Sequence, residues 1–230
     1  IIDLEWLGKL AKKHNVILLV DNCFATPVLQ RPADYVAHLV LHSATKWIDG
    51  QGRVLGGIVV GKKNLIDELY LFCKNTGPSI SPFNAWLLSK SLETLDVRIQ
   101  RHCDNAEALV NSLKGHPKLN SIKYPFDPSH PMYEVAKKQM RRGGGLITFD
   151  LKGGLEGGKK FLDALEMLTL TSNLGDTRSI ASHPATTTPA KLTPAEQLEV
   201  GITPGLIRIS VGLENIEDIK ADIIHALEKC

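Results

Sequence analysis

The chain has 230 residues, of which 43% are hydrophobic and 23% are charged, a composition typical of globular proteins. This composition excludes a disordered, collagen-like or coiled-coil chain. The 27 lysines and arginines stand against 25 aspartates and glutamates, and a net charge of +2 provides no basic surface for nucleic acid or an anionic membrane. We therefore expect a small-molecule ligand.

The sequence carries no signal for a membrane, for export or for a structural metal. No apolar run approaches the roughly 18 residues of a membrane helix, and residues 1–10 lack the order of a signal peptide. The cysteines are far apart and form no C-x-x-C pair, so neither a disulfide framework nor a zinc site is indicated. We expect a cytoplasmic protein without membrane contact or bound metal.

The first part of the chain has the pattern of an α/β sheet. Residues 4–11 have helical spacing after Asp3, which is a possible N-cap. Three apolar runs, at 16–20, 38–42 and 56–61, are typical of strands buried in a sheet. No strand precedes the first helix, although each crossover unit takes roughly 30 residues. We therefore expect an N-terminally truncated chain with an open sheet edge.

The rest of the chain predicts one long helix and then a second, α+β domain. A helix over about 82–113 is expected to link the two bodies. Next come a strand near 121–124, a helix near 132–140 and a strand over 145–151. Thr193 and Glu196 form a capping-box pattern, and Asn215 is the expected cap of the last helix.

The residues that follow the first two strand-like runs are the strongest chemical signal. Ligands of open α/β sheets bind at the carboxyl ends of strands, where Asp21, Ser43, Thr45 and Lys46 are expected. This set suits pyridoxal 5′-phosphate (PLP): Lys46 would form the Schiff base, Asp21 would pair with the pyridine nitrogen, and the two hydroxyls would bind the phosphate. The same residue types are also ordinary turn and surface residues, so the pattern alone leaves both interpretations open.

A family resemblance favours the cofactor site. Residues 21–27 read D-N-C-F-A-T-P and residues 42–46 read H-S-A-T-K, a pair of segments that resembles the Cys/Met-metabolism family of PLP-dependent enzymes. The D-G-Q-G-R-V-L-G-G sequence at 49–57 is most similar to the O-succinylhomoserine sulfhydrylase branch. The similarity continues through residues 77–95, 171–188 and 205–215, and so covers nearly the whole chain.

The resemblance implies a fold and a set of site residues. The fold is that of the PLP-dependent transferases of fold type I, with residues 1–97 as the C-terminal part of the large domain and 98–230 as the small α+β domain. Lys46 then carries the cofactor, while Asn173 and Arg208 contact the substrate. The full-length protein is expected to form a homo-oligomer, a dimer or a tetramer.

The implied activity is a γ-replacement in transsulfuration and methionine biosynthesis. O-succinylhomoserine, or O-acetylhomoserine, would react with sulfide to give homocysteine. Alternatives are a cystathionine γ-synthase, a cystathionine lyase, or an inactive remnant that only oligomerises. The family's phosphate loop and stacking aromatic would precede Ile1, so this chain is expected to bind PLP weakly or not at all. Pro189 stands where relatives usually have histidine.

Several other residues have a functional and a structural interpretation. His38 and His42 have a metal-like spacing, but no third ligand is near in sequence, so structural histidines are favoured. Cys23 lies close to Asp21 and could contact the cofactor, although packing is favoured. Trp47 and Trp86 are expected in the core.

Overall fold

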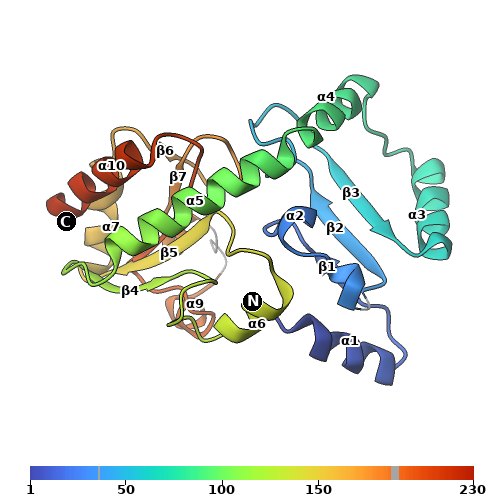
Figure 1. Ribbon diagram of the computed structural model, residues 1–230, viewed down its shortest axis with the longest axis horizontal. Coiled ribbons are helices and arrows are strands. Elements are labelled where there is room, and N and C mark those ends of the chain that lie inside the picture. The colour runs from blue at the N-terminus through green and yellow to red at the C-terminus, as the bar shows by residue number, and fades with distance from the viewer. Residues whose placement is uncertain (36, 188–191) are drawn as a thin grey trace.

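The computed structural model describes residues 1–35, 37–187 and 192–230. Two bodies, each built on its own sheet, are joined along helix α5 (Leu95–Leu113) (Figure 1). The first sheet has the order β1-β2-β3 and the second has the order β4-β5-β8-β7-β6. Pro189 lies outside the described residues. Within the described ranges, no helix combines the length and the apolar character that a bilayer span requires.

The first body combines three short strands with several helices. Its elements are α1 (Leu4–Lys13), β1 (Leu19–Asp21), α2 (Thr26–Leu29), η1 (Pro32–Tyr35), β2 (Leu39–Ser43), β3 (Gly57–Gly61), α3 (Lys63–Thr76) and α4 (Pro82–Leu92). Strands β1 and β2 are parallel, whereas β3 is antiparallel to β2. The expected N-cap of α1 is confirmed, because the Asp3 carboxylate accepts a hydrogen bond from the Trp6 N–H.

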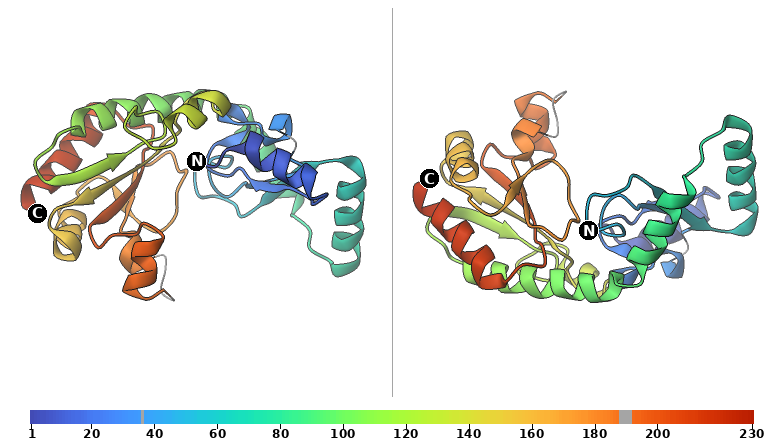
Figure 2. Two further views of the ribbon diagram at one scale, coloured as in Figure 1. Left: turned by 90° about the horizontal axis from the view of Figure 1, so that it is seen from below. Right: turned by 90° about the horizontal axis from the view of Figure 1, so that it is seen from above.

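The first body buries less than its sequence pattern predicts. The run at 16–20 becomes a strand only from Leu19, and the Val16 and Ile17 side chains are more than half exposed. Strand β3 is also mostly exposed, so the expected burial of both runs was wrong. Helix α3 stands away from the sheet and has no buried residue (Figure 2). Within the described residues, β1 and β3 form the two edges of this three-stranded sheet, and the helix that follows β3 buries none of its own residues against it.

The two tryptophans expected in the core have different environments. Trp47 is 1% exposed, as expected, and its ring packs edge-on against the His102 ring. Trp86 lies on α4 and is 56% exposed, so that expectation was wrong. Helix α4 contributes Leu88 to the core, whereas the Trp86 ring lies beside that of Phe83 on the same helix, with the ring centroids 5.8 Å apart.

The expected single helix over 82–113 is two helices, α4 and α5. Carbonyl groups at the end of α4 are taken by side chains: the Arg98 guanidinium and the Thr94 hydroxyl both donate to the Ser91 carbonyl oxygen. Side chains that bond to nearby main-chain groups compete with the helical ladder. We attribute the break between the two helices to these contacts. The apolar periodicity of the sequence continues through the break and therefore gives no sign of it.

The second body is a five-stranded sheet covered by helices on one face. Its remaining elements are β4 (Leu119–Lys123), α6 (Tyr133–Gln139), β5 (Leu146–Leu151), α7 (Gly154–Asp163), β6 (Thr169–Leu170), β7 (Ile180–Ser182), α8 (Pro184–Thr187), α9 (Pro194–Glu199), β8 (Leu206–Ser210) and α10 (Ile216–Lys229). Helices α5, α7 and α10 pack over the core of this sheet (Figure 2). The capping box of α9 and the Asn215 cap of α10 are confirmed.

Candidate functional site

The parallel pairing of β1 and β2 brings the polar residues after both strands to the same edge of the sheet. Asp21 is paired in register with Leu41, two residues before Ser43. Asp21 therefore lies beside the loop that begins at Ser43 and continues to Lys46. This is the arrangement that the chain order of the two strands predicts.

Main-chain hydrogen bonds and one buried arginine fix the loop that carries Lys46. The Asp49 N–H donates to the Ala44 carbonyl oxygen at 2.8 Å, and the Gly50 N–H donates to that of Lys46 at 2.8 Å. Arg98, on α5 and only 7% exposed, donates to the carbonyl oxygens of Trp47 at 2.6 Å and Ile48 at 3.0 Å. The loop is thereby held at its C-terminal end by the helix that joins the two bodies.

Residues of the second body complete the surroundings of Lys46. The Lys46 Nζ atom donates to the Asn173 side-chain oxygen at 2.6 Å. Arg208, on β8, donates from Nη2 to the carbonyl oxygens of Ser172 at 2.8 Å and Asn173 at 3.1 Å. Burial lowers the pKa of Arg208, whose guanidinium is only partly exposed. The structure thus brings Lys46, Asn173 and Arg208 together from segments far apart in the sequence.

The two hydroxyl residues of the loop differ in how their side chains are used. The Thr45 hydroxyl accepts from the Gly56 N–H at 3.2 Å and lies 3.4 Å from the Gly56 carbonyl oxygen, so it ties the loop to the start of β3. The Ser43 main-chain N–H donates to the Cys23 sulfur at 2.7 Å. Within the described chain, the Ser43 hydroxyl has no hydrogen-bond partner, which leaves it available to a ligand.

The acidic and sulfur groups of the site are close together. One Asp21 carboxylate oxygen accepts from the Cys23 N–H at 3.0 Å, and the Asp21 side chain is exposed. Burial and the hydrogen bond to Asp21 raise the pKa of the Cys23 thiol to about 11. Cys23 is therefore a neutral thiol near pH 7 and serves as a hydrogen-bond partner of the loop rather than as a nucleophile.

The nearby histidines have structural positions. His38 Nδ1 accepts the Leu18 N–H at 3.0 Å and so fixes the chain just before β1. His42 lies on β2 and is 7% exposed, and burial lowers its pKa. The hydrogen bond of His38 to the main chain and the burial of His42 favour the structural interpretation.

The residues present fit PLP, the group that the resemblance implies. The Lys46 amine is hydrogen-bonded to the neutral Asn173 amide, and it forms no ion pair with a carboxylate of the described residues. The Asp21 carboxylate is exposed and can accept a pyridinium N–H in addition to the Cys23 N–H. The free Ser43 hydroxyl can donate to a phosphate oxygen.

Some residues that shape the site were not foreseen from the sequence. Arg98 occupies the apolar face of α5, between Leu95 and Ile99, and this position is the one signal that could have revealed a buried arginine. Thr26 has a φ of 60°, in the left-handed region, which a β-branched residue rarely adopts and no local pattern announces. Gln139 reaches this region from the second body, as described below.

Comparison with known proteins gives the family. The family model described as Cys/Met metabolism PLP-dependent enzyme matches residues 1–228. O-succinylhomoserine sulfhydrylase of Pseudomonas aeruginosa is 44% identical over 227 residues, which are 99% of this chain and 56% of that protein. L-methionine gamma-lyase of Fusobacterium nucleatum is 44% identical over 232 residues, which are 100% of this chain and 59% of that protein.

A solved structure has the same fold. Cystathionine gamma synthase from Xanthomonas oryzae pv. oryzae, crystallised in complex with aminoacrylate and cysteine, matches with a TM-score of 0.96 and 38% identity, over 100% of this chain and 59% of that one. The likeness confirms the expected fold type I, and this chain spans 56% to 59% of the length of these relatives. Because the family model covers nearly all of its residues, the chain belongs to the Cys/Met metabolism family of PLP-dependent enzymes, whose cofactor is pyridoxal 5′-phosphate.

Proposed function

We propose that the full-length protein converts O-succinylhomoserine, or O-acetylhomoserine, and sulfide into homocysteine. The Cγ–O bond of the ester breaks, a Cγ–S bond forms, and the carboxylic acid leaves. One observation carries this proposal: Lys46 Nζ donates to the Asn173 side chain, and Arg208 donates to the Asn173 carbonyl oxygen. An amine and a cation that can bind a carboxylate therefore lie within one site. The division into residues 1–97 and 98–230 and the assembly of a homo-oligomer belong to the same proposal.

The first body would hold the cofactor. When bound, PLP supplies an aldehyde for covalent attachment and an electron-withdrawing ring that stabilises negative charge on the neighbouring carbon. Lys46 would be the attachment point. Asp21 would keep a proton on the ring nitrogen, because an ionised carboxylate favours the charged form of its partner. Ser43 and Thr45 would donate hydrogen bonds to the phosphate.

The second body would hold the substrate. Arg208 uses Nη2 for the two carbonyl groups of residues 172 and 173, and its Nε and Nη1 atoms have no partner among the described residues. A cation with free N–H donors suits an oxygen of the α-carboxylate of an amino acid. Once released by the substrate amine, the Lys46 amine would carry protons to and from Cα and the neighbouring carbons, and the Asn173 amide would keep it over them.

The alternative within the family is a reaction with a different sulfur compound. Cysteine in place of sulfide gives cystathionine, and the likeness to a cystathionine gamma synthase with a TM-score of 0.96 favours this as the second candidate. Turnover of the full-length protein with sulfide and with cysteine as competing nucleophiles separates the two. A preference for cysteine would support the second candidate, and elimination without either nucleophile would support a lyase.

The substitution Lys46→Ala tests the assignment of the attachment point. In the full-length protein, we expect turnover to fall at least about a thousandfold, because both the covalent link and the proton carrier are lost. Borohydride reduction followed by mass spectrometry of the digested protein should place the cofactor on the peptide that contains Lys46. Lys63→Ala is the control, since Lys63 is exposed and its amine pairs with Asp67 on the same helix.

Two results would contradict the proposal. Normal turnover by Lys46→Ala, or a cofactor adduct on another lysine, would overturn the role of Lys46. A full-length protein without a visible absorption band in the presence of PLP would support the remnant alternative.

A further inference from the structure

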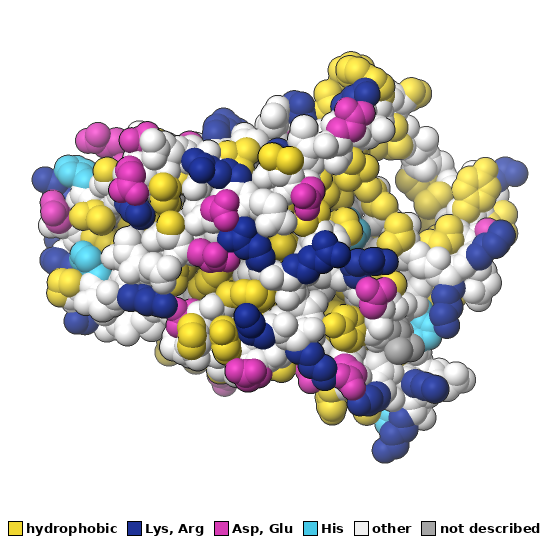
Figure 3. Space-filling model, viewed as in Figure 1, with side chains coloured by type: hydrophobic (Ala, Val, Ile, Leu, Met, Phe, Trp, Pro, Cys, Tyr) yellow, Lys and Arg dark blue, Asp and Glu magenta, His cyan; other side chains and the backbone are white. Residues whose placement is uncertain are grey.

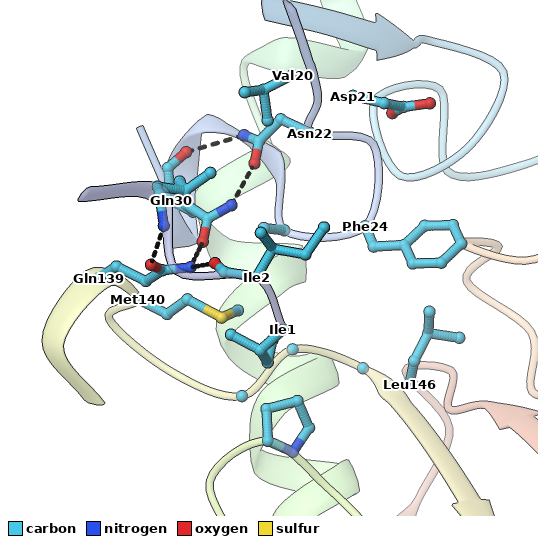
Figure 4. Close-up of a pocket in the computed structure, with 16 residues that line it drawn as sticks. Ile1, Ile2, Val20, Asp21, Asn22, Phe24, Gln30, Gln139, Met140 and Leu146 are labelled. Carbon is cyan, nitrogen blue, oxygen red and sulfur yellow. Dashed lines mark hydrogen bonds between the residues drawn. The ribbon is translucent and has the colours of Figure 1, made fainter. Parts of the chain in front are cut away.

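A chain of side-chain amides connects the second body to the turn that follows Asp21 (Figure 4). The Gln139 Nε2 atom, at the end of α6, donates to the Gln30 side-chain oxygen at 3.0 Å. Gln30 Nε2 donates in turn to the Asn22 side-chain oxygen at 2.9 Å. Gln139 is 9% exposed and Asn22 is 2% exposed, so water does not compete freely for these groups.

Both ends of this amide chain are anchored to the main chain. The Gln139 side-chain oxygen accepts the Leu4 N–H at 3.1 Å, and its Nε2 also donates to the Ile2 carbonyl oxygen at 2.8 Å. Asn22 Nδ2 donates to the carbonyl oxygens of Thr26 at 3.1 Å and Gln30 at 2.9 Å. Reversing any one amide would set donor against donor or acceptor against acceptor. The orientation of all three amides is therefore fixed.

Asn22 uses these contacts to stabilise a strained turn. Thr26 has a φ of 60°, and its N–H and carbonyl oxygen are bonded to the main chain and the side chain of Asn22, respectively. Strained backbone of this kind persists only where the surroundings over-determine it. The turn includes Cys23, whose N–H holds the Asp21 carboxylate. Figure 4 shows the Asp21 side chain directed away from the amide chain, so the turn is held from the side opposite to its carboxylate.

Apolar packing does not fix the junction by itself. A cavity of about 410 Å³ lies between the N-terminal segment, the turn and residues 143–146, and Asp21, Asn22 and Gln139 are among the residues that line it. A cavity contributes no van der Waals contacts between its walls. Polar contacts therefore span this part of the junction: the amide chain, and beside it the Arg141 N–H, which donates to the Leu29 carbonyl oxygen at 2.9 Å.

We propose that Gln139 is a positioning residue for Asp21. Through Gln30 and Asn22 it holds the turn after β1 at a fixed place relative to the second body, which carries Asn173 and Arg208. The inference rests on the proposed function of Asp21 as the partner of the ring nitrogen. Its effect would be to keep the cofactor-binding carboxylate in register with the substrate-binding side chains.

Hydrogen exchange of the 230-residue chain tests the connection without the cofactor. Gln139→Met keeps the size of the side chain and removes its hydrogen bonds. We expect the main-chain amides of residues 22–30 to exchange about tenfold faster, since a buried hydrogen-bond network is lost. Lys138→Met is the matched control, because it removes the ion pair with Glu5 at the same junction but not the amide chain. Its exchange in residues 22–30 should be unchanged.

Gln30→Met interrupts the same chain from the first body and should give the same acceleration, so the test does not depend on one variant being stable. Unchanged exchange of residues 22–30 in Gln139→Met, or equal acceleration in Lys138→Met, would overturn the inference. In the cofactor-loaded full-length protein, Gln139→Met should shift the pH midpoint of the visible absorption band and Lys138→Met should not. A missing adduct at Lys46 would overturn the proposed function instead, and the exchange result would still decide the positioning role.

Discussion

Arg98 shows how a single residue can stabilise the loop that carries Lys46. It donates to the carbonyl oxygens of Trp47 and Ile48 in this loop and to that of Ser91 at the end of α4, which also accepts from the Thr94 hydroxyl. Burial lowers its pKa, and the nearby Asp49 carboxylate opposes this effect. An arginine remains charged under these conditions, so the buried charge is distributed over several oxygen atoms.

His102 predicts a pH dependence of stability. Its side chain is fully buried, its Nδ1–H donates to the Val211 carbonyl oxygen at 2.6 Å, and burial lowers its pKa from 6.5 to about 4. The folded protein therefore favours the neutral ring, whereas the unfolded chain takes up a proton below pH 6.5. The stabilisation is complete above this pH and is lost as the pH falls toward 4, by roughly 3 kcal/mol in total.

Urea denaturation between pH 7 and pH 4 measures this effect. The variant His102→Gln keeps a donor for the Val211 carbonyl oxygen but cannot titrate, so its free energy of unfolding should fall less steeply with decreasing pH than that of the unchanged chain. The exposed His14→Gln substitution is the control, and its profile should be parallel to that of the unchanged chain. Equal slopes for all three proteins would show that His102 does not contribute.

At the residue scale, local contacts were predictable and distant ones were not. The caps at Asp3, Thr193 and Asn215 were correctly predicted because each depends on neighbours within a few positions. The contact between Lys46 and Asn173 spans 127 positions. Only the family resemblance placed the two residues in one site, since a single sequence contains no physical signal for so distant a pair.

At the scale of elements, the type of each was predictable more often than its boundaries or burial. The alternation around residues 146–151 depends on the packing of one sheet face, and β5 follows it. The run at 16–20 is equally apolar, but the burial of its side chains depends on which elements cover them in the folded chain, and most of this run is exposed. The break between α4 and α5 depends on Arg98, whose effect on the Ser91 carbonyl group arises only in the folded chain.

Helix α10 contains an acidic residue that connects two elements. The Asp222 carboxylate is 8% exposed and accepts the N–H groups of Glu166 at 2.8 Å, Met167 at 3.1 Å and Leu168 at 3.0 Å. In Asp222→Asn, an amide N–H₂ replaces one acceptor and faces at least one of these donors. We expect the free energy of unfolding to fall by about 2 kcal/mol. Urea denaturation near pH 7 measures the change.

Glu228→Gln is the matched control for this substitution, because it is also a carboxylate-to-amide change on α10 but at an exposed position. Its effect should stay within about 0.5 kcal/mol. If Asp222→Asn behaved like the control, the three hydrogen bonds would contribute little to the attachment of the segment that leads into β6.

At the scale of the whole molecule, the chain exposes more surface than its size predicts. A monomeric protein of 25.2 kDa has an expected accessible surface of about 10,300 Å², whereas this chain has 12448 Å². Figure 3 shows hydrophobic side chains gathered around the opening beside α3 and α4. Phe72, Phe83 and Trp86, from these helices, are each more than half exposed. Exposed apolar side chains of the first body therefore contribute to this excess.

This asymmetry predicts that the two bodies unfold in separate steps. The second body has the larger cluster of fully buried apolar residues, on a five-stranded sheet, while the first has a smaller cluster around Trp47 and an open sheet. All tryptophans of the chain, Trp6, Trp47 and Trp86, lie in the first body, and only Trp47 is buried. Tryptophan fluorescence should therefore change at a lower urea concentration than the last phase of far-ultraviolet circular dichroism.

A chain with Trp6→Phe and Trp86→Phe leaves Trp47 as the single reporter and should show the same early transition. Helix α5 contributes Leu95 and Ile99 to the first cluster and Leu109 and Leu113 to the second. Strand β5 also contacts both, because Leu146 packs against the first cluster while Phe149 lies in the second. Superimposable fluorescence and dichroism curves would mean that these two elements couple the bodies into one cooperative unit. Separate curves would mean that the few contacts across the junction are weaker than the core of the second body.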